Sequence, residues 1–145
     1  MRIRVLLLCA LAALPLRGQS PEPPMEKVLG IGGVFFRSRE PRKLAEWYEK
    51  HLGVTRTPDS YEKDPWIQAA GPTVFAPFAA TTRYFGDSTK QWMINFRVRD
   101  LDAMVAQLRR AGIEVTVDPQ AYPNGRFARL KDPEGTAIEL WEPKK

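Results

Sequence analysis

Glu139 is the side chain that the sequence favours most strongly for a chemical role. It lies in the run Ala137–Trp141, where alternation along a strand separates it from Ile138 and Leu140. The apolar pair is expected to face a helix, so Glu139 is expected to face a cavity on the other side of a sheet. There it could contact a ligand or act as a general base. The alternative is a carboxylate that only pairs with a neighbouring cation.

A predicted hairpin gives Glu139 such a cation. The segment Asp132–Gly135 has proline at the second position and glycine at the last, which fits a type I turn with a glycine bulge. Counting outward from this turn puts Arg129 opposite Glu139. It also puts Phe127 opposite Trp141. A cross-strand guanidinium holds a carboxylate ionised, so Glu139 is predicted to accept hydrogen bonds more readily than to act as an acid.

Further candidate contacts come from the same kind of alternation. The strand predicted at residues 92–98 places three residues on the cavity side and three apolar residues under a helix. Apolar walls with a few converging polar groups are typical of a small-molecule pocket. Besides Glu139, the predicted catalytic residue, the predicted ligand-binding residues are Arg129, Asn95, Arg97, Phe127, Trp141, Met93, Arg37 and Trp66. Each aromatic member of this set is alternatively an ordinary core residue.

The histidine and cysteine content disfavours nucleophilic catalysis. The one histidine, His51, precedes Leu52 and Gly53 at the predicted end of a helix, where the helix dipole favours a cation. The one cysteine, Cys9, lies in an N-terminal apolar run that we expect to be removed. A serine or cysteine nucleophile with a histidine base is therefore not available in its usual form.

The elements that would position these side chains begin with a β-rich first half. Gly30–Arg37 has strand-forming content, with two internal glycines that indicate a bulge or close backbone approach. A helix is predicted to begin at Pro41 and to end before Gly53, with an apolar stripe along one face. Two shorter strands, Pro65–Ala70 and Thr73–Ala80, are separated by a Gly-Pro turn signal.

The same order of elements is predicted in the second half. A strand over Trp92–Val98 precedes a helix that Asp100 can cap. Ile113–Val117 follows as a strand, and Arg126–Lys131 pairs with Thr136–Trp141 as the hairpin.

Two matches at a nearly constant spacing indicate an internal repeat. Phe36–Glu40 resembles Phe96–Asp100 sixty residues later, and Gly53 corresponds to Gly112 fifty-nine residues later. We therefore predict an α+β domain of two paired βαβββ modules, whose strands form a curved, mostly antiparallel sheet with a concave cavity. The predicted domain covers residues 28–145, and its modules cover about residues 28–86 and 91–143.

The first eighteen residues have the pattern of a secretory signal peptide. A basic head, Met1–Arg4, precedes the apolar run Val5–Leu14, and Gly18 offers a small residue for cleavage. The alternative is a frayed N-terminal helix of a cytosolic protein. Cleavage would leave a polar, Pro-rich tether at residues 19–27 and no membrane-spanning segment, so a periplasmic or secreted protein is expected.

Cleavage also changes the charge balance. The removed segment holds three arginines and no acid, so the formal net charge falls by three, from +5 to +2. A nearly balanced chain gives no reason to expect nucleic acid as a partner.

Four segments carry a family resemblance over about Val28 to Pro143. They are GIGGVFFRS, KLAEWYEKHLGV, FRVRDLDAMVAQLRRAGIEV and GRFARLKDPEGTAIELWEP, of which Asp132–Leu140 is the most specific part. Together they resemble the vicinal oxygen chelate superfamily, which includes glyoxalase I, bleomycin-resistance proteins and extradiol dioxygenases. The resemblance implies two paired βαβββ modules with a concave cavity, and it does not fix one reaction. It also implies that two chains often pair, so a homodimer is expected.

The positions that hold a metal ion in metal-using relatives are poorly matched. By the resemblance, one of them falls at Gly33, a second falls at or near Met93, and the last-strand carboxylate falls at Glu139. The fourth falls in a strand around Thr73–Phe78, which has no His, Asp or Glu. Since a transition metal needs three or four N, O or S ligands, neither a metal nor another cofactor is expected. A metal enzyme with a rearranged site is a more distant alternative.

Two functions from different classes remain open. The first is an exported glyoxalase-like domain that binds a small organic molecule in its concave cavity without a metal. The second is a metal-independent isomerase, lyase or hydrolase that acts on a small carbonyl compound. In the second case Glu139 would be the general base, and Arg129, Arg97 or Asn95 would stabilise developing negative charge.

Overall fold

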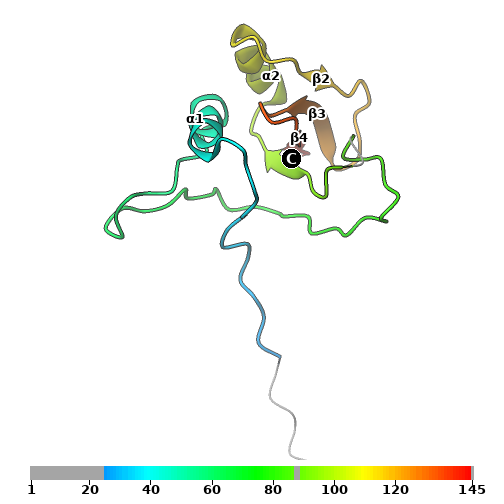
Figure 1. Cartoon of the computed structure of the whole chain (residues 1–145). Coiled ribbons are helices and arrows are strands. Elements are labelled where there is room, and N and C mark those ends of the chain that lie inside the picture. The colour runs from blue at the N-terminus through cyan, green and yellow to red at the C-terminus, as the bar shows by residue number, and fades with distance from the viewer. Residues whose placement is uncertain (1–24, 87–88, 145) are drawn as a thin grey trace, which may run out of the picture. The chain divides into compact units, whose positions relative to one another are not determined.

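Two helices and four strands make up the regular structure in the computed structural model, which describes residues 25–86 and 89–144 (Figure 1). In chain order they are α1 (Pro41–Leu52), β1 (Ile94–Arg97), α2 (Leu101–Arg110), β2 (Thr116–Val117), β3 (Gly125–Lys131) and β4 (Ala137–Pro143). All lie in residues 35–145, and residues 25–34 have no regular secondary structure. The predicted α+β class is confirmed.

The predicted signal peptide and residues 19–24 of the predicted tether lie outside the described residues. Within residues 25–86 and 89–144, no helix has the length and apolar character needed to cross a membrane.

The sheet is formed by the second half of the chain. Its strand order is β1-β4-β3-β2, with β1 parallel to β4 and the other pairs antiparallel. The succession β1-α2-β2-β3-β4 is the βαβββ order predicted for this half, although β1 and β2 are shorter than expected. The register across the hairpin is also as predicted, because Arg129 lies opposite Glu139 and Phe127 lies opposite Trp141.

The turn between β3 and β4 has the predicted geometry. The amide of Asp132 donates to the carbonyl of Thr136 at 3.0 Å, and the amide of Gly135 donates to the carbonyl of Asp132 at 2.9 Å. Gly135 has φ 80°, the left-handed conformation that a glycine bulge requires. The Asp132 carboxylate also accepts from the amides of Glu134 and Thr136, so this buried side chain fixes the turn from inside.

The helices cover one face of the sheet. Leu101 and Leu108 of α2 and Ile138 and Leu140 of β4 are fully buried, and Leu44 of α1 joins the same core. Burial of each such side chain is worth about 1.5–3 kcal/mol. The predicted alternation is therefore correct, since Ile138 and Leu140 lie under the helices while Glu139, between them, points to the other face.

Both helices begin and end at the predicted signals. α1 starts with Pro41 and stops at Gly53, which has φ 69°. The side chain of Asp100 accepts the amide of Ala103 at 2.9 Å and thereby caps α2. Gly112, with φ 75°, follows the end of α2. The proline, aspartate and glycine residues at the helix ends thus set where each helix begins and stops.

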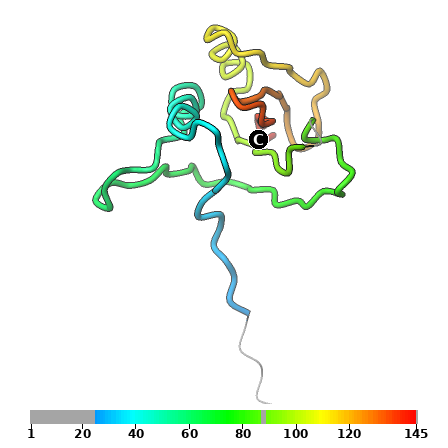
Figure 2. The backbone as a smooth tube through the Cα atoms, in the orientation of Figure 1, coloured from blue at the N-terminus to red at the C-terminus, as the bar shows by residue number. Residues whose placement is uncertain are grey.

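The strands predicted in the first half are absent. Gly30–Arg37, Pro65–Ala70 and Thr73–Ala80 contain no strand, and residues 53–86 and 89–93 have no regular secondary structure (Figure 2). A strand is stabilised by hydrogen bonds to a neighbouring strand, and the backbone hydrogen bonds found within residues 55–86 close only local turns. These segments contain many residues that favour strands, but they have no strand to pair with in the described chain.

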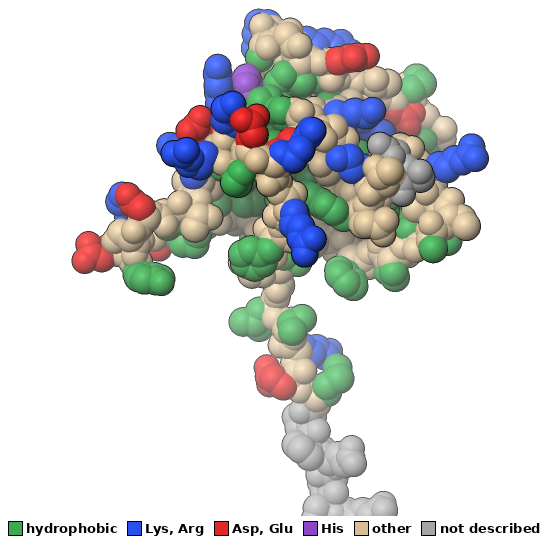
Figure 3. Space-filling model, viewed as in Figure 1, with side chains coloured by type: hydrophobic (Ala, Val, Ile, Leu, Met, Phe, Trp, Pro, Cys, Tyr) green, Lys and Arg blue, Asp and Glu red, His purple; other side chains and the backbone are tan. Residues whose placement is uncertain are grey.

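Apolar side chains in these segments consequently remain in contact with solvent. Phe35, Ile67, Val74 and Phe75 are each at least 70% exposed. Hydrophobic side chains accordingly show on the surface seen in Figure 3.

Candidate functional site

Glu139 is the centre of a hydrogen-bonded group on the face of the sheet away from the helices. Although charged, it is only 5% exposed. Its Oε1 accepts from Asn95 Nδ2 at 2.9 Å. Its Oε2 accepts from the Tyr84 hydroxyl at 2.9 Å and from Arg129 Nε and Nη2 at 3.2 and 3.1 Å. We call Glu139, Asn95, Tyr84 and Arg129 the carboxylate cluster.

Strand pairing positions three members of the carboxylate cluster. The parallel register of β1 and β4 sets Asn95 beside Glu139. The antiparallel register of β3 and β4 sets Arg129 opposite Glu139. Two cross-strand contacts therefore meet on one carboxylate, and both follow from side-chain alternation along neighbouring strands.

Tyr84 completes the cluster from the irregular connection before β1. The guanidinium of Arg129 lies over its ring, 4.1 Å from the centroid, and Phe78 stacks on it at 5.1 Å. Burial and the hydrogen bond to Glu139 raise the pKa of Tyr84 above its usual value of 10.0. The phenol consequently stays protonated at neutral pH and remains a donor to the carboxylate.

An aromatic group adjoins the carboxylate cluster on the same face. The rings of Phe127 and Trp141 are parallel within 4°, with centroids 6.2 Å apart, and Tyr122 meets Phe127 edge-on at 5.7 Å. The indole N–H of Trp141 donates to the carbonyl of Asn124 at 2.8 Å. The two strands thus present apolar and polar surface next to each other, as ligand pockets commonly do.

Arg97 and Trp66, two other predicted site residues, contact other parts of the chain. Arg97 donates to the carbonyls of Ala69 and Ala70 at 2.7 and 3.2 Å, so it holds the first-half connection instead of joining the carboxylate cluster. Trp66 packs on Phe96, whose ring belongs to the helix-covered side.

Among the described residues, neither of the last two predicted residues donates a hydrogen bond to Glu139. Met93 is half-buried just before β1. Arg37 lines a pocket next to the β3–β4 turn, which none of the carboxylate cluster lines. The structure therefore brings together Glu139, Arg129 and Asn95, with Phe127 and Trp141 beside them.

Tyr84 is the member that sequence reasoning missed. The available signal was the aromatic pair Tyr84-Phe85 before Gly86. A residue in an irregular connection has no strand register, so its partner cannot be counted out as that of Arg129 can.

The described residues do not offer a fitting set of metal ligands. Within residues 25–86 and 89–144, no group of three or more His, Cys, Asp and Glu side chains could hold a metal ion. His51, the one histidine, lies in the last turn of α1 against Trp47, as predicted for a helix-end residue. The donor set around Glu139 consists of a phenol, an amide and a guanidinium, which do not suit a transition metal. The absence of a metal or other cofactor stays a prediction.

Comparison with known proteins identifies relatives over much of the chain. A family model described as a glyoxalase-like domain matches residues 33–141. CFP32 of Mycobacterium tuberculosis (strain CDC 1551 / Oshkosh), whose name describes it as a glyoxylase, is 40% identical over 53 residues. The match covers 36% of this chain and 20% of CFP32, so the chain spans about a fifth of the length of the curated relatives it matches.

Two solved structures from Streptomyces sp. CB03234 are also similar. A glyoxalase/bleomycin resistance protein is 34% identical, with 36% of this chain and 46% of that chain covered and a TM-score of 0.32. TnmS3, an antibiotic binding protein, is 25% identical, with 72% of this chain and 88% of that chain covered and a TM-score of 0.44.

Proposed function

Because the chain belongs to the glyoxalase-like domain family, we propose that it binds a small organic molecule at the carboxylate cluster, without a metal ion. One observation carries this proposal. The two oxygens of Glu139 accept four hydrogen bonds from three side chains. Such a carboxylate is a fixed hydrogen-bond acceptor in a preorganised polar site, and few of its lone pairs are left for a metal ion.

The distribution of these hydrogen bonds favours one side for the ligand. From the described part of the chain, Oε2 of Glu139 accepts three of them and Oε1 accepts one. A carboxylate oxygen has about two lone-pair sites, so Oε1 can take one more donor. The amide oxygen of the exposed residue Asn95 adds a neighbouring acceptor. A ligand with a hydroxyl or N–H donor and an aromatic face to pack near Phe127 matches this surface.

The experiment is a binding assay on wild type and Glu139→Gln. Compounds released from purified protein would be identified by mass spectrometry, and the affinity of the strongest binder would be measured by calorimetry. Glutamine keeps the shape but loses the charge and one acceptor, so we expect affinity to fall at least about tenfold. Glu114→Gln, at an exposed acid outside the cluster, is the matched control and should bind as wild type does.

Two results would contradict the proposal. One is equal affinity in wild type and Glu139→Gln, or no binding from a broad panel. The other is stoichiometric transition metal in carefully purified protein, measured by elemental analysis.

A metal-independent enzyme is the second candidate, and the remaining lone pair of Oε1 is the observation that favours it. A general base needs an oxygen free to take a proton, and the nearby guanidinium of Arg129 would stabilise developing negative charge. Turnover of a small carbonyl compound that survives Glu139→Gln would remove this residue from the mechanism.

We further propose that the protein is exported, on the basis of its N-terminal sequence pattern. N-terminal sequencing of protein recovered outside the cytoplasm should begin near Gln19. Recovery of chains that still begin at Met1 would contradict export by cleavage.

A further inference from the structure

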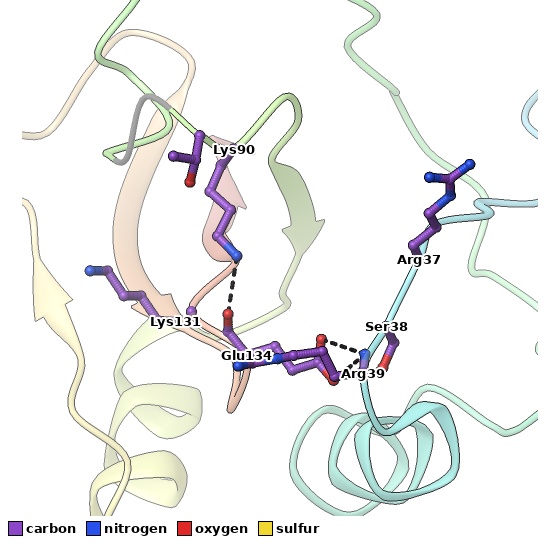
Figure 4. Close-up of a pocket in the computed structure, with 8 residues that line it drawn as sticks. Arg37, Ser38, Arg39, Lys90, Lys131 and Glu134 are labelled. Carbon is purple, nitrogen blue, oxygen red and sulfur yellow. Dashed lines mark hydrogen bonds between the residues drawn. The ribbon is translucent and has the colours of Figure 1, made fainter.

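A pocket with a strongly basic lining lies beside the β3–β4 turn. Its volume is about 550 Å³, and its cations are Arg37 and Arg39 before α1, Lys90 before β1, and Lys131 at the end of β3. Among the described residues that line it, Glu134 is the one acid. Figure 4 shows Lys90 between Lys131 and Arg37, with Glu134 reaching toward the chain before α1. We call this the basic pocket.

The acid in the basic pocket is already satisfied by neutral donors. The carboxylate of Glu134 accepts from the Ser38 hydroxyl at 2.7 Å and from the amides of Arg39 and Glu40 at 3.0 Å. Lys90 Nζ donates to the backbone carbonyl of Glu134 at 3.0 Å and not to its carboxylate. Among the described lining residues, the four cations therefore share one carboxylate, and its oxygens accept hydrogen bonds from other donors.

These four cations lack the nearby carboxylates that several other arginines of the chain have. Arg56, Arg126 and Arg129 each have a carboxylate oxygen within 3.1 Å. Among residues 25–86 and 89–144, no carboxylate oxygen lies within 4.0 Å of a charged nitrogen of the four cations. The described residues of the basic pocket thus have a formal charge of +3, from four cations and one anion. Clustered like charges repel one another, and an external anion would relieve this repulsion.

We propose that the basic pocket binds a doubly charged tetrahedral oxyanion, the chemistry shared by free phosphate or sulfate and by a phosphate monoester. Guanidinium groups match such oxygens with paired hydrogen bonds, and ammonium groups add point charges. A dianion balances a charge of +3 better than chloride or acetate does. Because the ligand would join three separate segments of chain, its binding should stabilise the folded protein.

The test is thermal unfolding of the full chain in inorganic phosphate, sulfate and glycerol phosphate. Sodium chloride and sodium acetate at matched ionic strength control for screening. We expect the dianions to raise the Tm by roughly 3 °C near saturation and the monovalent salts to leave it unchanged. A larger shift with glycerol phosphate identifies an organic ester as the better ligand, and a larger shift with phosphate identifies the free anion. Either result supports the proposal.

Paired double variants make the test specific. Arg39→Gln with Lys131→Gln should abolish the dianion shift. Lys50→Gln with Arg110→Gln removes the same charge from exposed cations outside the basic pocket and should preserve the shift. Phosphorus NMR line broadening on wild type measures binding without unfolding, so the result does not depend on how well a variant folds. No dianion-specific effect, or the same loss in both double variants, overturns the proposal.

This site is separate from the carboxylate cluster. The variant with Arg39→Gln and Lys131→Gln should bind the organic ligand of the proposed function with wild-type affinity. A negative result for the basic pocket therefore does not contradict ligand binding at the carboxylate cluster, and the reverse also holds.

Discussion

The hydroxyl of Tyr84 gives the Glu139 site both a hydrogen bond and a pH dependence. Tyr84→Phe removes one donor to Oε2 and leaves the two from Arg129. We expect a loss of about 1 kcal/mol in the free energy of unfolding near pH 7. Urea denaturation of the variant and wild type measures this difference.

The sign of the pH effect follows from the raised pKa of Tyr84. Burial and Glu139 hold the folded-state pKa above 10.0, so above that pH the folded chain keeps a proton that the unfolded chain loses. This contribution is complete below pH 10 and disappears as the pH rises through the folded value. The difference in free energy of unfolding between wild type and Tyr84→Phe should therefore decrease above pH 10. Tyr61→Phe, at a fully exposed tyrosine, should change neither the stability nor its pH dependence.

The β3–β4 turn connects the sheet to α1 through Glu134. α1 has no side-chain cap of its own, and the Glu134 carboxylate instead accepts the amides of Arg39 and Glu40 at its start. On the other side of the same turn, the hydroxyl of Tyr48 donates to buried Asp132 at 3.0 Å. Two side chains of one turn therefore attach α1 to the sheet.

Acid should weaken this attachment. The Ser38 hydroxyl and the amides of Glu40 and Arg39 lower the pKa of Glu134 below 4.5. A lowered pKa means that the stability is present above pH 4.5 and is lost as the pH falls through the folded value. Glu134→Gln should be less stable than wild type near pH 7, and the two should converge in acid. Urea denaturation across this range measures the difference, and parallel curves would contradict the assignment.

Gly125, at the start of β3, is predicted to tolerate no side chain. Its φ is 137°, and an added Cβ would collide with the backbone carbonyl oxygen of Glu142. Gly112 also has a positive φ but has open space around it. We expect Gly112→Ala to cost about 1–2 kcal/mol for backbone strain, and Gly125→Ala to cost distinctly more. Chemical denaturation of both variants provides the comparison, and equal losses would show that the contact with Glu142 relaxes freely.

At the scale of the whole molecule, the exposed apolar side chains favour association of two chains. Phe35, Ile67 and Phe75 are at least 75% exposed, on segments whose backbone forms no strand. β1 also lies at one edge of the sheet, where a further strand could pair. A second copy of the chain would supply both a pairing partner and an apolar surface.

We expect a homodimer in analytical ultracentrifugation. Phe75→Ser should raise its dissociation constant at least about tenfold, because it removes one large apolar contact. Tyr61→Ser, at a fully exposed aromatic residue in a turn, is the control and should leave the dimer intact. Monomeric wild type at all concentrations would contradict this expectation.

The sequence predicts the second half well because its signals are local. Pro133 and Gly135 fix the turn, alternation then fixes the register, and Arg129 is brought to Glu139 as counted. Asp100 caps its helix for the same reason. The first half has the repeated sequence pattern but does not form the predicted strands. A strand needs a neighbouring strand to pair with, and strand propensity alone does not supply one. Tyr84 reaches Glu139 from an irregular connection, which no periodicity describes.

A ribosome adds β4 last among the strands, although β1 pairs directly with it. Asn95 and Glu139 are 44 positions apart, so the sheet lacks a central strand until nearly all of the described chain has been synthesised. Until then α1 has neither a sheet to pack on nor Glu134 at its first turn. The nascent polypeptide should therefore stay open to protease and to chaperones. A chain that is still unfolded when its synthesis ends could also pass through a secretion channel that admits only unfolded polypeptides.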